Sequence, residues 1–124
     1  MRYALIGCGR IATNHMKAAV NNQLEISAVC DVVPEHMEVL LAKHELQNDM
    51  SILRYTDYRS MIQEVKPDLV SIATESGIHA EIALFCIDHG VHVIIEKPMA
   101  MSISDANEII RHSEEKHVKV SACH

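Results

Sequence analysis

Near the amino end, the residue types and their spacing suit the binding of a phosphorylated ligand. A short apolar run at residues 3–6 breaks into Gly-Cys-Gly-Arg-Ile-Ala at residues 7–12, the G-x-G-x-x-A form of a dinucleotide-binding fingerprint. Gly7 would allow a tight turn, Gly9 would let the backbone approach a pyrophosphate, and the small Ala12 would let the next helix pack on a sheet. The phosphates would then face N–H groups at the start of that helix.

An acidic residue follows at a position that fits the same chemistry. Asp31 ends the next apolar run, close to the spacing of about 20 residues at which an acid holds the ribose hydroxyls of NAD. A carboxylate there repels a 2′-phosphate, and the following Val32 and Val33 bring no arginine to receive one, so NAD is favoured over NADP. Asp31 could instead cap the helix that begins at Pro34.

The elements that must position these residues alternate regularly along the chain. We expect strands at residues 3–6, 24–30, 52–55, 68–74, 91–95 and 118–122, with helices between them. This alternation predicts an α/β fold, a doubly wound parallel (Rossmann) sheet of order 3-2-1-4-5-6, as a single domain over residues 1–124. The glycine loop, Asp31, Thr74 and the Glu96-Lys97 pair all fall where strands end, which is the edge at which such sheets bind ligands.

Local signals predict where several helices begin and end. Pro34 is placed to begin the second helix, which we expect to end near residue 47. Gly77 would open the helix before the fifth strand, and Gly90 would cap its end. Ser102, with Asp105 three residues later, is typical of a capped helix start.

Composition narrows the class of protein. The net charge is −6 and neither lysine nor arginine gathers into a run, which argues against nucleic-acid and acidic-membrane partners. We expect no signal peptide or transmembrane segment, and the four cysteines without short paired spacing indicate free thiols in a reducing cytoplasm. The nine histidines show no spacing that favours a metal site, so we expect none.

Taken together, these motifs resemble the N-terminal half of the Gfo/Idh/MocA family of oxidoreductases. The resemblance covers essentially the whole chain: residues 4–12, Asp31 with Pro34-Glu35, residues 70–74 with His79-Ala80-Glu81, and most specifically His-Val-Ile-Ile-Glu-Lys-Pro at residues 92–98. Two features depart from the family. Glu75-Ser76 stands where the family commonly has Pro-Asn. We also expect the family's C-terminal substrate and oligomerisation domain to be absent from this chain.

The resemblance implies roles for individual residues. The second strand's acid, Asp31, would hold the adenosine ribose, Thr74 and His79 would lie near the nicotinamide, and Lys97 would face the reacting carbon as the catalytic residue. It also implies a cis peptide bond before Pro98. Arg10 could lie along the pyrophosphate or be solvated, and His79 could instead lie on a helix surface. The expected cofactor-binding residues are Gly7, Gly9, Arg10, Ile11, Asp31, Thr74, His79, Glu96, Lys97 and Pro98.

The resemblance also implies an activity: hydride transfer between NAD and a hydroxyl or carbonyl of a sugar, cyclitol or sugar nucleotide. The Lys97 ammonium would hydrogen-bond the substrate oxygen that is oxidised or reduced. The chain alone would bind cofactor without turnover, and the full-length enzyme would be a homo-oligomer. Two alternatives remain open, a non-catalytic redox-sensing module and a methyltransferase-type fold, and the Glu-Lys-Pro sequence at residues 96–98 favours the oxidoreductase.

Overall fold

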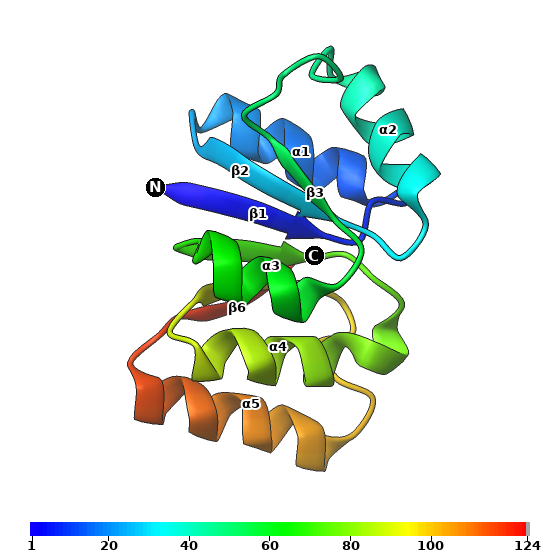
Figure 1. Ribbon diagram of the computed structural model, residues 1–124. Helices are drawn as coiled ribbons and strands as arrows, with labels where there is room; N and C mark the ends of the chain where they lie inside the picture. Colours follow the sequence, from blue (N-terminus) through cyan, green and yellow to red (C-terminus); the bar gives the residue numbers. More distant parts are fainter. Residues whose placement is uncertain (124) are drawn as a thin grey trace.

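Strands and helices alternate along the chain in the order that the sequence predicts. The structure, a computed structural model, describes residues 1–123. Its strands pair in parallel in the order β3-β2-β1-β4-β5-β6, which confirms the predicted doubly wound sheet (Figure 1). The elements are β1 (Arg2–Ile6), α1 (Ala12–Asn21), β2 (Glu25–Cys30), α2 (Pro34–Lys43), β3 (Leu53–Tyr55), α3 (Tyr58–Val65), β4 (Leu69–Ile72), η1 (Ser76–Ile78), α4 (His79–Asp88), β5 (His92–Glu96), α5 (Ile103–Lys116) and β6 (Val120–Cys123).

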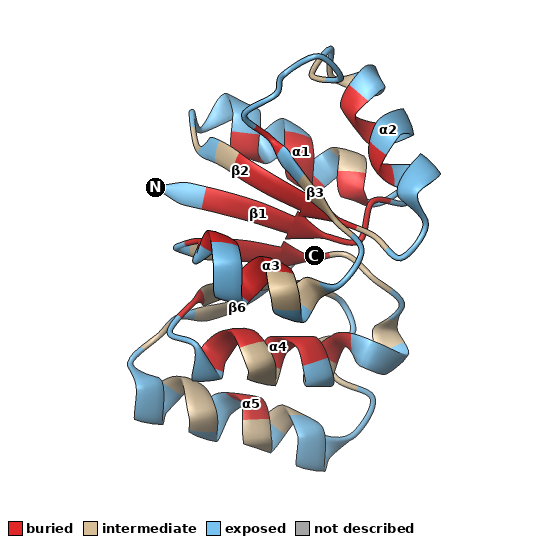
Figure 2. Ribbon diagram, viewed as in Figure 1, coloured by how far each residue is buried: buried red, intermediate tan, exposed pale blue. Residues whose placement is uncertain are grey.

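The sheet lies between two apolar clusters, one on each face. Successive residues of a strand point to opposite faces, so Leu5 joins the cluster under α1 and α2, while Ala4 and Ile6 join the cluster under α3, α4 and α5. Figure 2 shows the result: the central strands are buried along most of their length, whereas the helices are buried only where they face the sheet. Within residues 1–123, no helix is both long and apolar enough to cross a bilayer.

Four helices end with the same hydrogen-bond pattern, although only one of them has a glycine there. After α4, Gly90 adopts a φ of 76°, as predicted for its cap position. After α1, α2 and α5 the left-handed residues are Gln23, Glu45 and His117. In each case the next residue's N–H returns to a carbonyl in the last turn, as Leu46 does to Leu41 at 2.8 Å. This turn ends α2 at Lys43, earlier than the predicted end.

Other predicted boundaries hold or shift slightly. Pro34 is the first residue of α2, and Ser102 Oγ accepts a hydrogen bond from the Asp105 N–H at 3.1 Å at the start of α5. Gly77 does not open α4 directly, because the short 3₁₀ turn η1 precedes that helix. The last strand, β6, begins at Val120, two residues later than predicted.

Candidate functional site

The glycine loop begins at a position where the fold has no room for a side chain. Gly7 follows β1 with a φ of +94°, and a Cβ built there would lie 2.6 Å from the carbonyl carbon of Ala73. The Gly7 N–H donates to the Cys30 carbonyl at 2.8 Å, so the loop is held against the ends of both β2 and β4. Glycine is required here by the close approach of neighbouring backbone as well as by the turn.

The next glycine differs, because its Cβ position is open. No atom lies within 4 Å of a Cβ built on Gly9, and this residue is exposed and lines the cavity described below. Beyond it, Arg10 and Ile11 are exposed and lead into α1, which no side chain caps and whose first turn carries no acidic residue. A helix start of this kind favours an anion. Ala12 is fully buried against the sheet, as its small size predicts.

Asp31 ties the glycine loop to the end of β2. Its Oδ2 accepts a hydrogen bond from the Cys8 N–H at 2.8 Å, and its Oδ1 accepts one from the Val33 N–H, also at 2.8 Å. His36 Nδ1 lies 3.3 Å from the same Oδ1. The residue preceding α2 in the cap position is Val33, which makes no side-chain cap, so Asp31 is not the cap residue itself.

A cavity of about 400 Å³ opens between these elements at the carboxyl ends of β1, β2 and β4. Among the predicted site residues, the fold brings Gly7, Gly9, Asp31 and Thr74 together in its lining. Sequence reasoning missed the apolar and aromatic part of the wall, because nothing in the local sequence shows that the start of α3 and the end of η1 meet at the same edge. These additional lining residues include His36, Thr56, Tyr58, Ile78 and Ile82.

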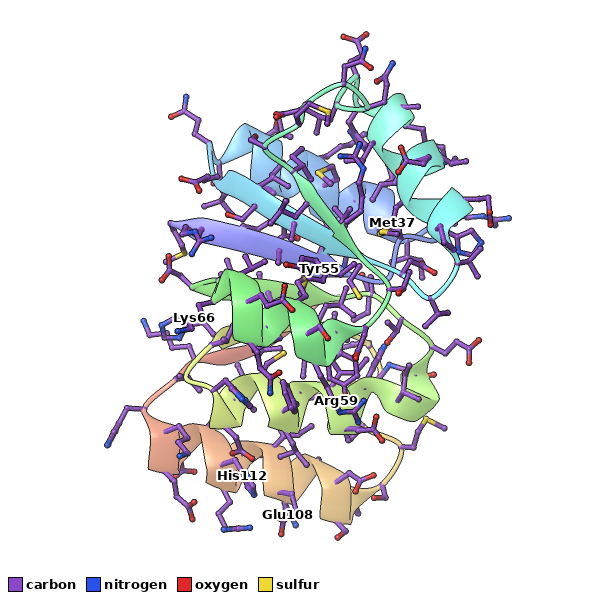
Figure 3. The ribbon with its side chains drawn as sticks, in the orientation of Figure 1. Met37, Tyr55, Arg59, Lys66, Glu108 and His112 are labelled. Carbon is purple, nitrogen blue, oxygen red and sulfur yellow. The ribbon has the colours of Figure 1, made fainter. Side chains whose placement is uncertain are left out.

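Tyr58 is fixed at this wall by contacts with α4. Its hydroxyl donates a hydrogen bond to Glu81 Oε2 at 3.1 Å, and the Arg59 guanidinium binds the same oxygen at 3.2 Å and lies over the Tyr58 ring. Figure 3 shows Arg59 between α3 and α4. Burial, followed by the Glu81 contact, raises the pKa of Tyr58 to about 12. The phenol is therefore neutral at physiological pH and serves as a fixed hydrogen-bond donor.

His79 does not lie on a helix surface, so that alternative is wrong. The side chain is 1% exposed at the start of α4. Its Nε2 lies 2.8 Å from the Thr74 carbonyl oxygen, and its Nδ1 lies 2.9 Å from the Pro98 carbonyl oxygen. With both ring nitrogens engaged by backbone, His79 does not line the cavity and instead joins the loops that follow β4 and β5.

The Glu-Lys-Pro segment at the end of β5 lies outside the cavity lining. The Lys97-Pro98 peptide bond is cis, as expected from the family resemblance. Lys97 and Pro98 are exposed. Glu96 turns toward α1, where its Oε1 lies 2.7 Å from Nε2 of the buried His15. Within this segment, Lys97 alone presents an exposed charged group beyond the strand end.

Two buried thiols lie behind the glycine loop. Burial, with the Asp31 charge as the next cause, raises the pKa values of Cys8 and Cys30 to about 12. Cys8, Cys30 and Cys86 are free and buried. Among the side chains that the structure describes, no three His, Cys, Asp or Glu residues are grouped so as to hold a metal ion.

The residues present fit a dinucleotide. The Cβ position of Gly9 opens onto the cavity, the start of α1 is uncapped, and Asp31 borders the same space. A carboxylate can accept about four hydrogen bonds, and Asp31 receives those of Cys8, Val33 and His36, which leaves capacity on Oδ2 for a hydroxyl. The cavity therefore offers a site for phosphates beside a site for a ribose.

Comparison with known proteins gives one consistent result. The family model Gfo/Idh/MocA, described as an oxidoreductase family with an NAD-binding Rossmann fold, matches residues 1–124. The chain is 26% identical over 121 residues to inositol 2-dehydrogenase of Salmonella typhimurium, covering 96% of this chain and 34% of that protein. It is 33% identical over 111 residues to D-glucoside 3-dehydrogenase of Escherichia coli, covering 88% of this chain and 30% of that protein.

A solved structure agrees with these relatives. The WlbA dehydrogenase from Bordetella pertussis, crystallised in complex with NADH and UDP-GlcNAcA, superposes with a TM-score of 0.86 at 28% identity. The match covers 99% of this chain and 34% of that one. The chain thus spans about a third of the length of the proteins that it matches.

Proposed function

Because the chain belongs to the Gfo/Idh/MocA oxidoreductase family, we propose that it binds NAD(H) in the cavity at the carboxyl ends of β1, β2 and β4. The observation that carries this proposal is the joint placement of Gly7, Gly9, Asp31 and Thr74 around one space. We propose further that the protein transfers hydride between the cofactor and a hydroxyl or carbonyl of a sugar, cyclitol or sugar nucleotide. The inositol, glucoside and UDP-sugar names of the matched proteins support this substrate class.

The adenosine half of the cofactor would lie beside Asp31. The free acceptor capacity on Oδ2 would receive a ribose hydroxyl, while the exposed Val32 and Ile78 line the cavity on either side and offer apolar surface to the base. A 2′-phosphate would meet the Asp31 carboxylate, so we propose NAD rather than NADP. The nearest basic side chain to this carboxylate is His36, whose Nδ1 lies 3.3 Å from Asp31 Oδ1.

The pyrophosphate would lie over Gly9 and the start of α1. Arg10 is exposed there and would contact the pyrophosphate from the solvent side, together with the Ile11 backbone. From there the nicotinamide would extend past Thr74 toward the end of β5, because β4 lies between β1 and β5 in the sheet. This order brings the reacting end of the cofactor toward Lys97 and separates it from the Asp31 end.

Lys97 would act on the substrate. NAD, when bound, accepts or gives the hydride, and the protein must hold the substrate oxygen and its proton. The Lys97 ammonium donates hydrogen bonds without accepting any, so it can hold the hydroxyl or carbonyl oxygen and stabilise negative charge on it. In a protein of the relatives' full length, Lys97→Ala should lower kcat at least 100-fold, within the range seen when one such donor is removed, with little change in NADH affinity.

We also propose the wider setting of this domain. Residues 1–124 would form the cofactor domain, and substrate contacts and subunit interfaces would come from the remaining two thirds of the length seen in the relatives, giving a homo-oligomer. Free buried thiols at Cys8, Cys30 and Cys86 support a cytoplasmic location. Light scattering on the full-length protein tests the assembly, and a monomer at micromolar concentration would contradict it.

A calorimetric titration tests cofactor binding directly. The chain is titrated with NADH and with NADPH at equal ionic strength, beside two matched variants, Asp31→Asn at the site and Asp49→Asn on the exposed turn before β3. We expect NADH to bind more tightly than NADPH, Asp31→Asn to reduce that preference, and Asp49→Asn to behave as the parent. Binding of neither cofactor, or equal effects of the two substitutions, would refute the proposed site.

A further inference from the structure

The turn that carries Lys97 is held from both sides by histidines of other elements. His15 of α1 contacts the Glu96 carboxylate at 2.7 Å, directly before Lys97. His79 of α4 contacts the Pro98 carbonyl at 2.9 Å, directly after it. Neither histidine lines the cavity at the strand ends. Lys97 itself is exposed, so its position depends on what holds its two neighbours.

On the α4 side, the contact joins two loops. His79 reaches the Thr74 carbonyl with Nε2 and the Pro98 carbonyl with Nδ1, and its ring is buried. Carbonyl oxygens only accept hydrogen bonds, so a hydrogen bond to either oxygen is donated by a ring N–H of His79. Because β4 and β5 are neighbours in the sheet, this ring fixes the spacing between Thr74 and the Lys97 turn.

On the α1 side, the contact links the same turn to the glycine loop. The Glu96 carboxylate accepts, so Nε2 of His15 donates. The two side chains are only 5% and 17% exposed, which makes the bond more costly to break than a surface ion pair. His15 lies one helical turn after the loop that would hold the pyrophosphate, so the bond sets the Lys97 turn relative to that loop.

We propose that His15 and His79 are positioning residues that together fix Lys97 over the nicotinamide end of the cofactor site. The inference rests on the proposed function, since it gives Lys97 a cofactor to face. It assigns neither histidine a contact with cofactor or substrate. Each acts through a neighbour of Lys97, and the two bonds come from opposite faces of the sheet, because α1 and α4 cover different faces.

Matched variants separate positioning from packing. His79→Leu removes both donors, whereas His79→Asn keeps an N–H donor close to the Nδ1 position and so to Pro98. His15→Leu removes the donor to Glu96, whereas His15→Gln places an amide N–H near the Nε2 position. Two readouts are taken on each chain: the backbone order parameter of Lys97 by ¹⁵N relaxation, and the affinities for NADH and for ADP-ribose, which lacks the nicotinamide.

We expect both leucine variants to lower the order parameter of Lys97 from the rigid value of about 0.85 to below about 0.6. The affinities for NADH and for ADP-ribose should both stay close to those of the parent, because neither histidine contacts the cofactor and Lys97 contributes little to its binding. The asparagine and glutamine variants should recover most of the Lys97 order parameter. An unchanged Lys97 order parameter, or an equal loss of NADH and ADP-ribose affinity, would overturn the inference.

The proposed function and this inference fail in different ways. If the parent chain binds neither NADH nor ADP-ribose, the cofactor proposal fails, while the order parameters still decide whether the histidines hold the turn. If the parent binds both ligands and the leucine variants leave Lys97 ordered, the cofactor site stands and the positioning role is refuted.

Discussion

Replacing Gly7 by alanine should destabilise the fold more than any other single change in the glycine loop. The added Cβ would lie 2.6 Å and 2.7 Å from the carbonyl carbon and oxygen of Ala73, and 2.8 Å from the Thr74 nitrogen. All three are backbone atoms at the end of β4, where a flexible side chain cannot move aside to make room. The φ of +94° adds strain of its own, because a residue with a Cβ rarely adopts it.

The two costs can be estimated separately. A non-glycine residue held at a positive φ costs about 1–3 kcal/mol, and forcing an extra methyl group into packed surroundings costs about 1–3 kcal/mol more. The sum, about 2–6 kcal/mol, is a large part of a typical domain stability of about 5–15 kcal/mol. At about 3–5 °C per kcal/mol for a chain of this size, Tm should fall by roughly 6–30 °C.

Gly9→Ala is the matched control, because the same methyl group there enters open space. We expect its unfolding free energy to stay within about 0.5 kcal/mol of the parent. Its NADH affinity should fall at least about tenfold, since the methyl group occupies the side on which the pyrophosphate would approach. Thermal unfolding by circular dichroism and calorimetric titration measure the two effects. Similar Tm values for both variants, or parental NADH affinity in Gly9→Ala, would refute the assignment of one glycine to the fold and the other to the ligand.

Three further predictions follow from particular contacts. Asp31→Ala should weaken NADH binding at least tenfold and destabilise the fold by about 1–3 kcal/mol, because the Cys8 and Val33 N–H groups lose their acceptor. Calorimetric titration and urea unfolding measure the two effects, and an unchanged free energy of unfolding would contradict the prediction. Ser102→Ala should cost about 1 kcal/mol of stability through loss of the cap on the Asp105 N–H, with NADH affinity unaltered. Burial raises the pKa values of the Cys8, Cys30 and Cys86 thiols to about 12. Above about pH 8.5 the unfolded chain therefore releases these protons while the native chain retains them. The free energy of unfolding should then fall as pH rises, by up to about 1.4 kcal/mol per pH unit for each thiol. Urea unfolding at increasing pH checks this, and a free energy of unfolding that stays constant between about pH 8.5 and 11 would contradict it.

The part of the site that sequence predicts well is the part whose signal is local. The fingerprint at residues 7–12 and the spacing to Asp31 depend only on the length of one strand-helix-strand unit, which is nearly constant in this kind of sheet. The order of the strands follows from the same units. The ends of helices are harder to predict. Gly90 indicates one of them, whereas Gln23 and Glu45 adopt a left-handed backbone because returning hydrogen bonds favour it there.

The remaining part depends on contacts between distant segments, for which a single sequence gives no spacing. His15 and Glu96 are 81 positions apart, and nothing near either residue shows that they meet. His79 reads equally well as a surface residue of α4 until the loops after β4 and β5 are seen to close over it. The resemblance to the family pointed to Lys97, but the means of holding it came from the fold. The sequence thus predicts which groups could bind and react, and the packing of helices on both faces of the sheet determines how firmly they are placed.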